Sequence, residues 1–336
     1  MTYCEAYSRA LNGFIVSREQ NYQLELRSGI CCVEDSDASD INSLLDRANM
    51  ALKTIKVKGA AQWKFYDHTM RDKLLREKDL EIRMEKALAD GEFLVYIQPK
   101  YWVGTRALAG GEALVRWKSP DQGFLSPGEF IPLFEKNRFI VKLDQFMFTS
   151  VCGLLRQWLD AGIEPRPLSV NVSRMQFHTP DFVERYIRIK SQYAIPDGLL
   201  ELEFTESIFF DNVALLSSAV HELRRAGIKC SIDDFGAGYS SLNVLKALPV
   251  SVLKLDGMFF RTAKDDEQAK IVIRNIMRMA GELKMATVAE GVETHEQVAF
   301  LETTGCDIIQ GYVFARPMPA AEFTELLAGE GGHAER

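Results

Sequence analysis

The segment Asp233-Asp234-Phe235-Gly236-Ala237-Gly238-Tyr239-Ser240-Ser241 joins two adjacent acids, at the end of an apolar run, to a loop that contains two glycines. Other polar residues stand at or near the ends of further short apolar runs: Glu112, Asn171, Glu203, Lys254, Glu290 and Gln310. Polar groups at successive strand ends indicate one site on the rim of a barrel. Because glycine adopts backbone angles that other residues avoid, we expect a mobile active-site loop after Asp234.

The region after Gly91 alternates short apolar runs with helical stretches, which predicts an α/β fold of the (β/α)8, TIM-like barrel type. The strands are expected at residues 93–97, 109–115, 168–172, 200–204, 228–232, 252–255, 286–289 and 308–312. The helices between them are expected to include residues 143–161, 180–193, 213–226, 268–284 and 294–304. A doubly wound open sheet is the alternative, although it would gather its ligand groups at one crevice.

The sequence before the barrel has a different pattern. Residues 1–67 suggest a small α/β fragment, with a strand at 23–33, a helix at 41–56 and a last strand at 62–66. Residues 68–90 alternate charges with apolar residues and predict a linker helix. The domains are therefore expected at 1–67, 68–90 and 91–328, followed by a tail at 329–336.

Composition narrows the class of protein. The 336 residues carry a net charge of −7 and have a pI near 5.5, which argues against binding of duplex nucleic acid through a broad basic surface. No run is long and apolar enough to span a membrane, and no signal peptide precedes the domains, so we expect a cytoplasmic chain, alone or as the cytoplasmic part of a larger sensor protein. The six cysteines form no C-x-x-C pair and are expected to be buried thiols.

Oxygen ligands dominate the set at the strand ends, which favours Mg²⁺ or Mn²⁺ over zinc. A single acid at such a place is more often a turn or cap residue, but these acids recur along the chain. They are Glu112, Glu203, Asp233 and Asp234, with Asn171 as a further oxygen donor. Adjacent carboxylates suit two divalent cations that share a ligand, an arrangement that favours phosphodiester hydrolysis.

Lys254 lies within an apolar run, where a lysine is costly unless it faces a polar site or pairs with an acid. It could orient and help to activate a water molecule; a buried ion pair with Asp256 is the structural alternative. Glu290 is a candidate base or water ligand, whereas Glu293 is expected to brace the loop. Glu206 is a candidate anchor for the loop after Asp234.

Arg116 follows Glu112 at even spacing on one predicted strand, so both side chains are expected on the same side, where a guanidinium could contact a phosphate. Trp117 is expected to pack in the core. Gln98 follows the first barrel strand and could recognise a base edge through its amide.

Residues 91–328 resemble the EAL domain of bacterial cyclic di-GMP phosphodiesterases. The motifs that carry the resemblance are GEALVRW, NVSRMQF, ELEFTES, DDFGAGYSS, LKLD, VAEGVET and QGYVFARP. The resemblance implies a barrel whose first strand is antiparallel, hydrolysis of cyclic di-GMP to linear pGpG, dependence on two Mg²⁺ or Mn²⁺ ions, and a homodimer formed near the loop after Asp234.

The resemblance also implies a role for each matching residue. The first metal would take Glu112, Asn171, Glu203 and Asp233, and the second Asp233 and Asp234. Lys254 and Glu290 match the water-activating pair, and Glu206 the loop anchor. The substrate-binding positions are Gln98, Leu114, Arg116 and Gln310. The chain departs from the family pattern at Lys100, where an aliphatic residue is usual.

Residues 1–67 resemble the second half of a GGDEF diguanylate cyclase domain, without the GGDEF signature, so cyclase activity is not expected. Two other functions compete with hydrolysis of the dinucleotide. A catalytically silent cyclic di-GMP receptor would be expected to lack a metal ligand or Lys254, and this chain keeps them all. A glycosidase could use Glu203 and Glu206, but the two aspartates and Lys254 would then have no purpose.

Overall fold

The computed structural model describes residues 27–33, 40–55, 63–205, 208, 213–236, 249–262 and 266–331. The chain divides into two compact units, Met1–Met84 and Glu85–Arg336. The helix α3 (His68–Ala89) runs across the division between them. None of the helices in the described part of the chain has the length and hydropathy that crossing a bilayer requires.

The first unit contains a parallel pair of strands, β1 (Ser28–Ile30) and β2 (Trp63–Phe65), and the helix α2 (Ile41–Lys53). Asp40 caps α2 by accepting from the backbone N–H of Asn42. The prediction of buried thiols is wrong for two cysteines of this unit, because Cys31 is half-buried and Cys32 is exposed, whereas Cys4 lies outside the described residues. Cys152, Cys230 and Cys306 of the second unit are buried free thiols, as predicted.

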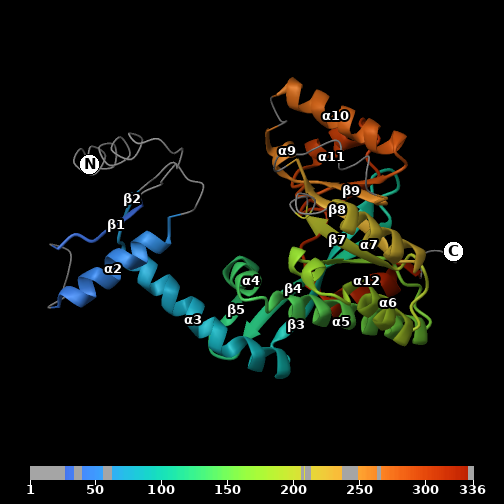
Figure 1. Ribbon diagram of the computed structural model, residues 1–336. Helices are drawn as coiled ribbons and strands as arrows, with labels where there is room; N and C mark the ends of the chain where they lie inside the picture. Colours follow the sequence, from blue (N-terminus) through green and yellow to red (C-terminus); the bar gives the residue numbers. More distant parts are fainter. Residues whose placement is uncertain are drawn as a thin grey trace. The chain divides into compact units, whose positions relative to one another are not determined.

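The second unit is a closed barrel, which confirms the predicted fold class (Figure 1). Its ring consists of β3 (Phe93–Trp102), β4 (Leu108–Ser119), β6 (Leu168–Asn171), β7 (Leu200–Thr205), β8 (Lys229–Phe235), β9 (Val252–Leu255), β10 (Ala286–Ala289) and β11 (Ile308–Ile309). The strands from β4 onward pair in parallel, whereas β3 closes the ring antiparallel to both β4 and β11. The antiparallel first strand is therefore confirmed.

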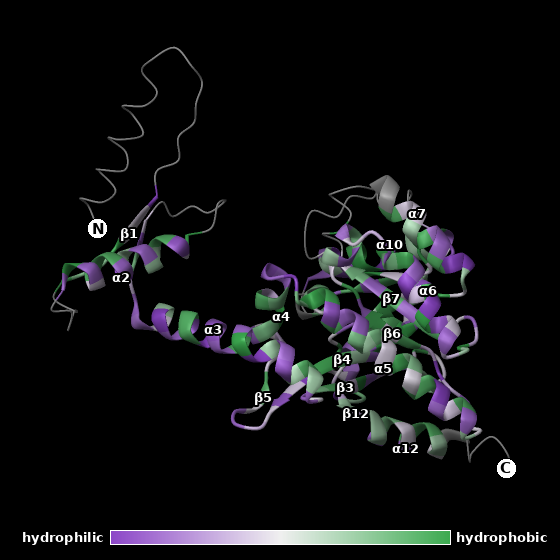
Figure 2. Ribbon diagram, turned by 60° about the horizontal axis from the view of Figure 1, so that its bottom comes forward, coloured by the Kyte–Doolittle hydropathy of each residue, from purple (hydrophilic) through white to green (hydrophobic). Residues whose placement is uncertain are grey.

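Helices surround this ring of strands. They are α5 (Ile140–Asp160), α6 (Phe182–Gln192), α7 (Val213–Arg225), α9 (Met258–Thr262), α10 (Glu267–Glu282), α11 (His295–Glu302) and α12 (Ala320–Gly331). Figure 2 shows that α5, α6 and α10 carry both hydrophilic and hydrophobic residues, while the barrel strands are largely hydrophobic. This pattern is expected of helices that bury one face against a sheet. Two short elements pair outside the ring, β5 (Gly123–Leu125) with β4 and β12 (Met318–Pro319) with β3.

The segment between β5 and α5 forms a helix that the sequence did not predict, α4 (Pro127–Lys136). A capping box between Ser126 and Glu129 starts it. Its buried aromatic residues pack around Trp117, whose ring is inaccessible to solvent and whose Nε1 donates to Glu92. The prediction that Trp117 is a packing residue is confirmed.

The first barrel strand is longer than predicted, because Pro99 does not end it. β3 pairs with β12 at Tyr96 and Ile97 and with β11 at Tyr101 and Trp102. Pro99 lies between these two pairings, where the missing N–H costs little. The residues after Pro99, Lys100 among them, consequently remain in the barrel wall. The last strand is shorter than predicted, since β11 ends at Ile309 before Gln310 and Gly311.

Gly110 allows strand β4 to lie close to the backbone of Pro167, which directly precedes β6. A Cβ atom there would lie 2.4 Å from the backbone oxygen of Pro167. We expect Gly110→Ala to lower the free energy of unfolding by about 2–4 kcal/mol, because backbone cannot yield as a flexible side chain can. Gly153→Ala, in helix α5 with only an ordinary contact to Tyr193, is the matched control and should be neutral or stabilising. Equal urea midpoints for the two variants would contradict the account.

Candidate active site

Lys254 lies at the centre of the acidic cluster at the strand ends. Its Nζ is 2.5 Å from Glu203 Oε2, 2.6 Å from Glu290 Oε1, 3.1 Å from Asp233 Oδ1 and 3.5 Å from Glu112 Oε2. Burial alone would lower the pKa of Lys254, but these carboxylates, Asp233 first, outweigh burial and raise it well above its usual value. The ammonium is therefore charged and bridges four acids, which lie on β4, β7 and β8 and directly after β10. Glu112 does not end its strand as predicted, because β4 continues to Ser119. Asp256 does not take part, since its Oδ1 accepts from the N–H of Met258.

Two side-chain amides donate hydrogen bonds to the carboxylate of Glu112. The Asn171 Nδ2 donates to Glu112 Oε1 at 2.6 Å, and the Gln310 Nε2 donates to Glu112 Oε2 at 2.6 Å and to Gln98 Oε1 at 3.1 Å. Burial, followed by the charge of Glu203, raises the pKa of Glu112. The Gln310 Oε1 is buried and accepts no hydrogen bond from the part of the chain that the structure describes, so this amide retains an acceptor for a group that enters the site.

Glu203 is held by two lysines. It is inaccessible to solvent, and its Oε1 accepts from Lys100 Nζ at 2.9 Å while its Oε2 accepts from Lys254. Burial alone would raise the pKa of Glu203, but Lys100 and Lys254 outweigh burial and lower it to about 2. Likewise, burial would lower the pKa of Lys100, but Glu203 outweighs it and the pKa is raised. Both partners are therefore ionised.

An irregularity in β8 brings Asp233 and Asp234 to the same site. Neighbours on a regular strand point to opposite faces. Here the register with β9 shifts between Ile232 and Phe235, and Asp234 has a φ of 55°, a strained value that aspartate tolerates better than most residues. Ligand oxygens of Asp233, Asp234 and Glu290 consequently lie within 4.8 Å of one another. Burial, together with Asp233 and Asp256, raises the pKa of Asp234 to about 6.

A cavity of about 390 Å³ opens beside this cluster and is lined by Leu114 and Arg116. Asn171 lines it too and so joins the cavity to the acids, through its hydrogen bond to Glu112. The Arg116 guanidinium lies 5.6 Å from the centre of the Tyr96 ring, and burial lowers the pKa of Arg116. The volume is in the range of small-molecule binding sites. Predicted substrate-binding residues and predicted metal ligands thus adjoin each other.

A buried acid also lines this cavity. Asp144 on α5 accepts from the backbone N–H of Ser173 at 3.0 Å and from Gln176 Nε2 at 3.3 Å. Burial raises the pKa of Asp144 to about 7, although both hydrogen bonds oppose the shift. The carboxyl therefore ties the segment after Asn171 to helix α5.

The raised pKa of Asp144 makes the free energy of unfolding depend on pH. The folded protein binds this proton more tightly than the unfolded chain does, so protonation of Asp144 stabilises the fold at low pH. This stabilisation is lost as the pH rises from about 4 to about 7. Between pH 5 and pH 8 we expect a loss of about 2–3 kcal/mol that Asp144→Asn does not show, since an amide does not titrate but keeps an acceptor for the same hydrogen bonds. Urea unfolding of both proteins at the two pH values measures the difference; parallel pH profiles would contradict it.

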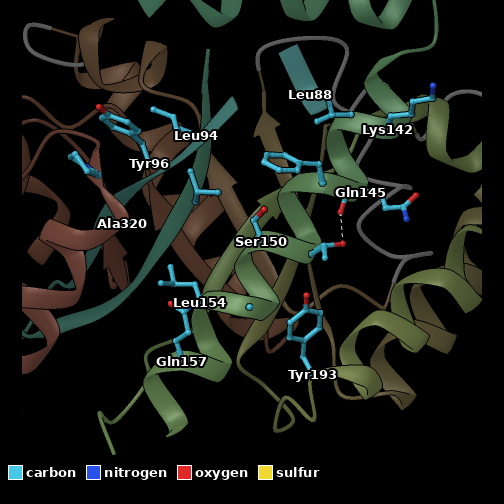
Figure 3. Close-up of a pocket in the computed structure, with 15 residues that line it drawn as sticks. Leu88, Leu94, Tyr96, Lys142, Gln145, Ser150, Leu154, Gln157, Tyr193 and Ala320 are labelled. Carbon is cyan, nitrogen blue, oxygen red and sulfur yellow. Dashed lines mark hydrogen bonds between the residues drawn. The ribbon is translucent and has the colours of Figure 1, made fainter. Parts of the chain in front are cut away.

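A larger cavity of about 810 Å³ lies elsewhere in this unit, between β3 and α5. Figure 3 shows Leu94 and Tyr96 of β3 on one side and Ser150, Leu154 and Gln157 along α5. Its lining includes neither the acids that surround Lys254 nor their hydrogen-bond partner Asn171, which lines the smaller cavity. The cavity beside the cluster is therefore the better substrate site.

One predicted residue, Glu293, lies apart from the cluster. Glu293 is exposed between β10 and α11, where its backbone N–H donates to Gln297 Oε1. Glu206 lies outside the described residues, as do residues 237–248 of the predicted loop. Their roles as brace, anchor and lid stay predictions.

Sequence reasoning missed Lys100 and Asp144 as residues of the site. The signal for Lys100 was its spacing: it follows Gln98 by two residues, so both face the same side if the strand continues through Pro99. Asp144 gave no comparable signal, because it lies within an amphipathic helix.

The family model of the EAL domain matches residues 82–317. The chain belongs to the EAL domain family. NbdA of Pseudomonas aeruginosa, a cyclic di-GMP phosphodiesterase, is 34% identical to it over 292 residues, which are 87% of this chain and 37% of NbdA. MucR of the same organism, a bifunctional diguanylate cyclase and cyclic di-GMP phosphodiesterase, is 32% identical over 292 residues, which are 87% of this chain and 43% of MucR.

A solved structure of the PaMucR phosphodiesterase in complex with c-di-GMP is 35% identical and superimposes with a TM-score of 0.69, covering 73% of this chain and 99% of that one. The chain spans less than half the length of the first curated relatives that it matches. The EAL domain of the present chain accounts for most of these similarities. The GGDEF-like character of residues 1–67 stays a prediction.

Proposed function

We propose that the chain hydrolyses cyclic di-GMP to linear pGpG at the cluster around Lys254, with two Mg²⁺ or Mn²⁺ ions. One observation carries the proposal: Lys254 bridges four carboxylates, and Asn171 links one of them, Glu112, to a cavity that is lined by Arg116. The relatives named as cyclic di-GMP phosphodiesterases and the c-di-GMP complex of PaMucR support the choice of substrate.

The donor set fits hard divalent cations, because it offers carboxylate and amide oxygens without histidine or cysteine. Asp233, Asp234 and Glu290 already place ligand oxygens within 4.8 Å of one another. Glu112, Asn171, Glu203 and Asp233 would hold one cation, and Asp233 with Asp234 the other. When bound, such ions polarise phosphoryl oxygens and lower the pKa of a ligated water.

The protein's own groups supply binding and proton transfer. Arg116 is suited to hold a phosphate oxygen, with Gln98, Leu114 and Gln310 on the side of the bases. Glu290 pairs with Lys254 at 2.6 Å, and as a carboxylate it is suited to accept a proton from water. The water oxygen bonds to phosphorus as the bond from phosphorus to the ribose O3′ breaks, and the leaving oxygen takes up a proton.

A cyclic di-GMP receptor without turnover is the second candidate. The observation that favours it is that the Lys254 ammonium already neutralises much of the acidic cluster without any metal ion. Such a receptor would bind the dinucleotide and leave it intact. Homodimerisation and a cytoplasmic location remain predictions that accompany either function.

Chromatography of the products distinguishes the two candidates. We expect the purified chain with Mg²⁺ or Mn²⁺ to convert cyclic di-GMP to pGpG, and Glu112→Gln to lose this activity. Glu164→Gln is the matched control, because Glu164 is an exposed acid that pairs with Arg166. Binding of intact cyclic di-GMP by the wild-type chain, without product at saturating cation, would favour the receptor.

A further inference from the structure

Lys100 is a second buried lysine of the site, and it enters from the antiparallel strand. It follows Gln98 by two residues on β3 and therefore faces the barrel interior with it. The side chain is 8% exposed, and its Nζ donates to Ser169 Oγ at 2.7 Å and to Glu203 Oε1 at 2.9 Å. A lysine buried to this degree is costly unless it is paired.

Each oxygen of the Glu203 carboxylate accepts a hydrogen bond from a different lysine. Lys100 engages Oε1 together with the Ser169 hydroxyl, and Lys254 engages Oε2. Glu203 has no solvent exposure, so neither oxygen has water as an alternative partner. Oε2 accepts from the lysine that also contacts Glu112, Asp233 and Glu290.

We propose that Lys100 is a positioning residue that fixes Glu203 through Oε1 and lowers the affinity of the acidic cluster for divalent cations. This inference rests on the proposed function. With Oε1 held by Lys100, Glu203 can offer a cation only Oε2, and only if Lys254 gives up its contact with that oxygen. The fixed positive charge of Lys100 also opposes a cation held by the same carboxylate, because charges a few ångströms apart interact strongly at a buried site. Occupancy of the site then follows the free cation concentration.

Titration of the full chain with Mn²⁺, without nucleotide, tests the proposal, with free Mn²⁺ followed by electron paramagnetic resonance. Lys100→Gln and Lys100→Met both remove the charge, and we expect about tenfold tighter Mn²⁺ binding in each. Lys190→Gln is the matched control and should bind Mn²⁺ as the wild type does. Lys190 is also buried and paired, but with Asp197 and the Ala226 carbonyl.

Turnover at saturating Mn²⁺ tests the positioning role. Glutamine keeps a donor toward Glu203, so Lys100→Gln should retain several times the turnover of Lys100→Met. Circular dichroism establishes that each variant is folded, and Lys100→Gln carries the test if the methionine variant is not. Equal or weaker Mn²⁺ binding by Lys100→Gln than by the wild type would overturn the inference alone. Absence of Mn²⁺ binding by the wild type would overturn the proposed metal site as well.

Discussion

Replacing Lys254 by methionine is expected to lower the rate of cyclic di-GMP hydrolysis by about a thousandfold or more. The ammonium is the shared partner of Glu112, Glu203, Asp233 and Glu290, the last of which is the proposed proton acceptor. Loss of such a group commonly costs two to four orders of magnitude in rate. Chromatographic measurement of pGpG formation at saturating Mg²⁺ gives the ratio of the two rates.

The same substitution should destabilise the metal-free protein. Removing one partner of a buried ion pair leaves uncompensated charge and typically costs about 3–5 kcal/mol. Here four carboxylates lose their common cation, so urea unfolding in chelator should show a loss of at least this size. Lys270→Met, which breaks a surface pair with Glu267, is the control and should change stability by under about 1 kcal/mol. A Lys254→Met protein with wild-type stability and turnover would contradict the role of Lys254 as the shared partner of these acids.

Asp233→Asn should also lose activity by about a thousandfold, but with a different effect on stability. Asparagine has nearly the same shape and removes the charge that both proposed cations would share. Asp233 attracts Lys254 at 3.1 Å yet repels the neighbouring carboxylates, so these contributions oppose each other in the metal-free state. We expect the free energy of unfolding in chelator to change by under about 1 kcal/mol.

The effect of Mn²⁺ on the melting temperature separates Asp233→Asn from a folding defect. A cation that binds only the folded state raises this temperature in proportion to its affinity. We expect a rise in the wild type and in the exposed control Glu164→Gln, and little or none in Asp233→Asn. An equal rise in all three would show that Asp233 is not a ligand.

The parallel strands could be predicted well because each is a short apolar run buried on both faces. The runs at 252–255 and 286–289 have the observed bounds of β9 and β10. These strands in turn placed Asn171, Glu203 and Lys254 together, since parallel strands deliver their carboxyl ends to one rim. Glu112 joins them from within β4, which extends to Ser119.

The features that could not be predicted depend on pairing between distant segments. Pro99 is tolerated because β11 and β12 pair on either side of it, which local sequence does not show. The shift of register at Asp234 needs β9 as its partner, and without it the alternation rule would send the two aspartates to opposite faces. Lys100 became part of the site only through the continuation of β3.

Metal-stripped protein incubated with cyclic di-GMP, with Mg²⁺ then returned, tests the central claim most directly. The account predicts intact cyclic di-GMP in chelator and its conversion to pGpG once Mg²⁺ or Mn²⁺ is present, as followed by chromatography. Conversion that continues in chelator would contradict the metal-dependent site. Cyclic di-GMP that stays bound and uncut at saturating cation would contradict the enzyme.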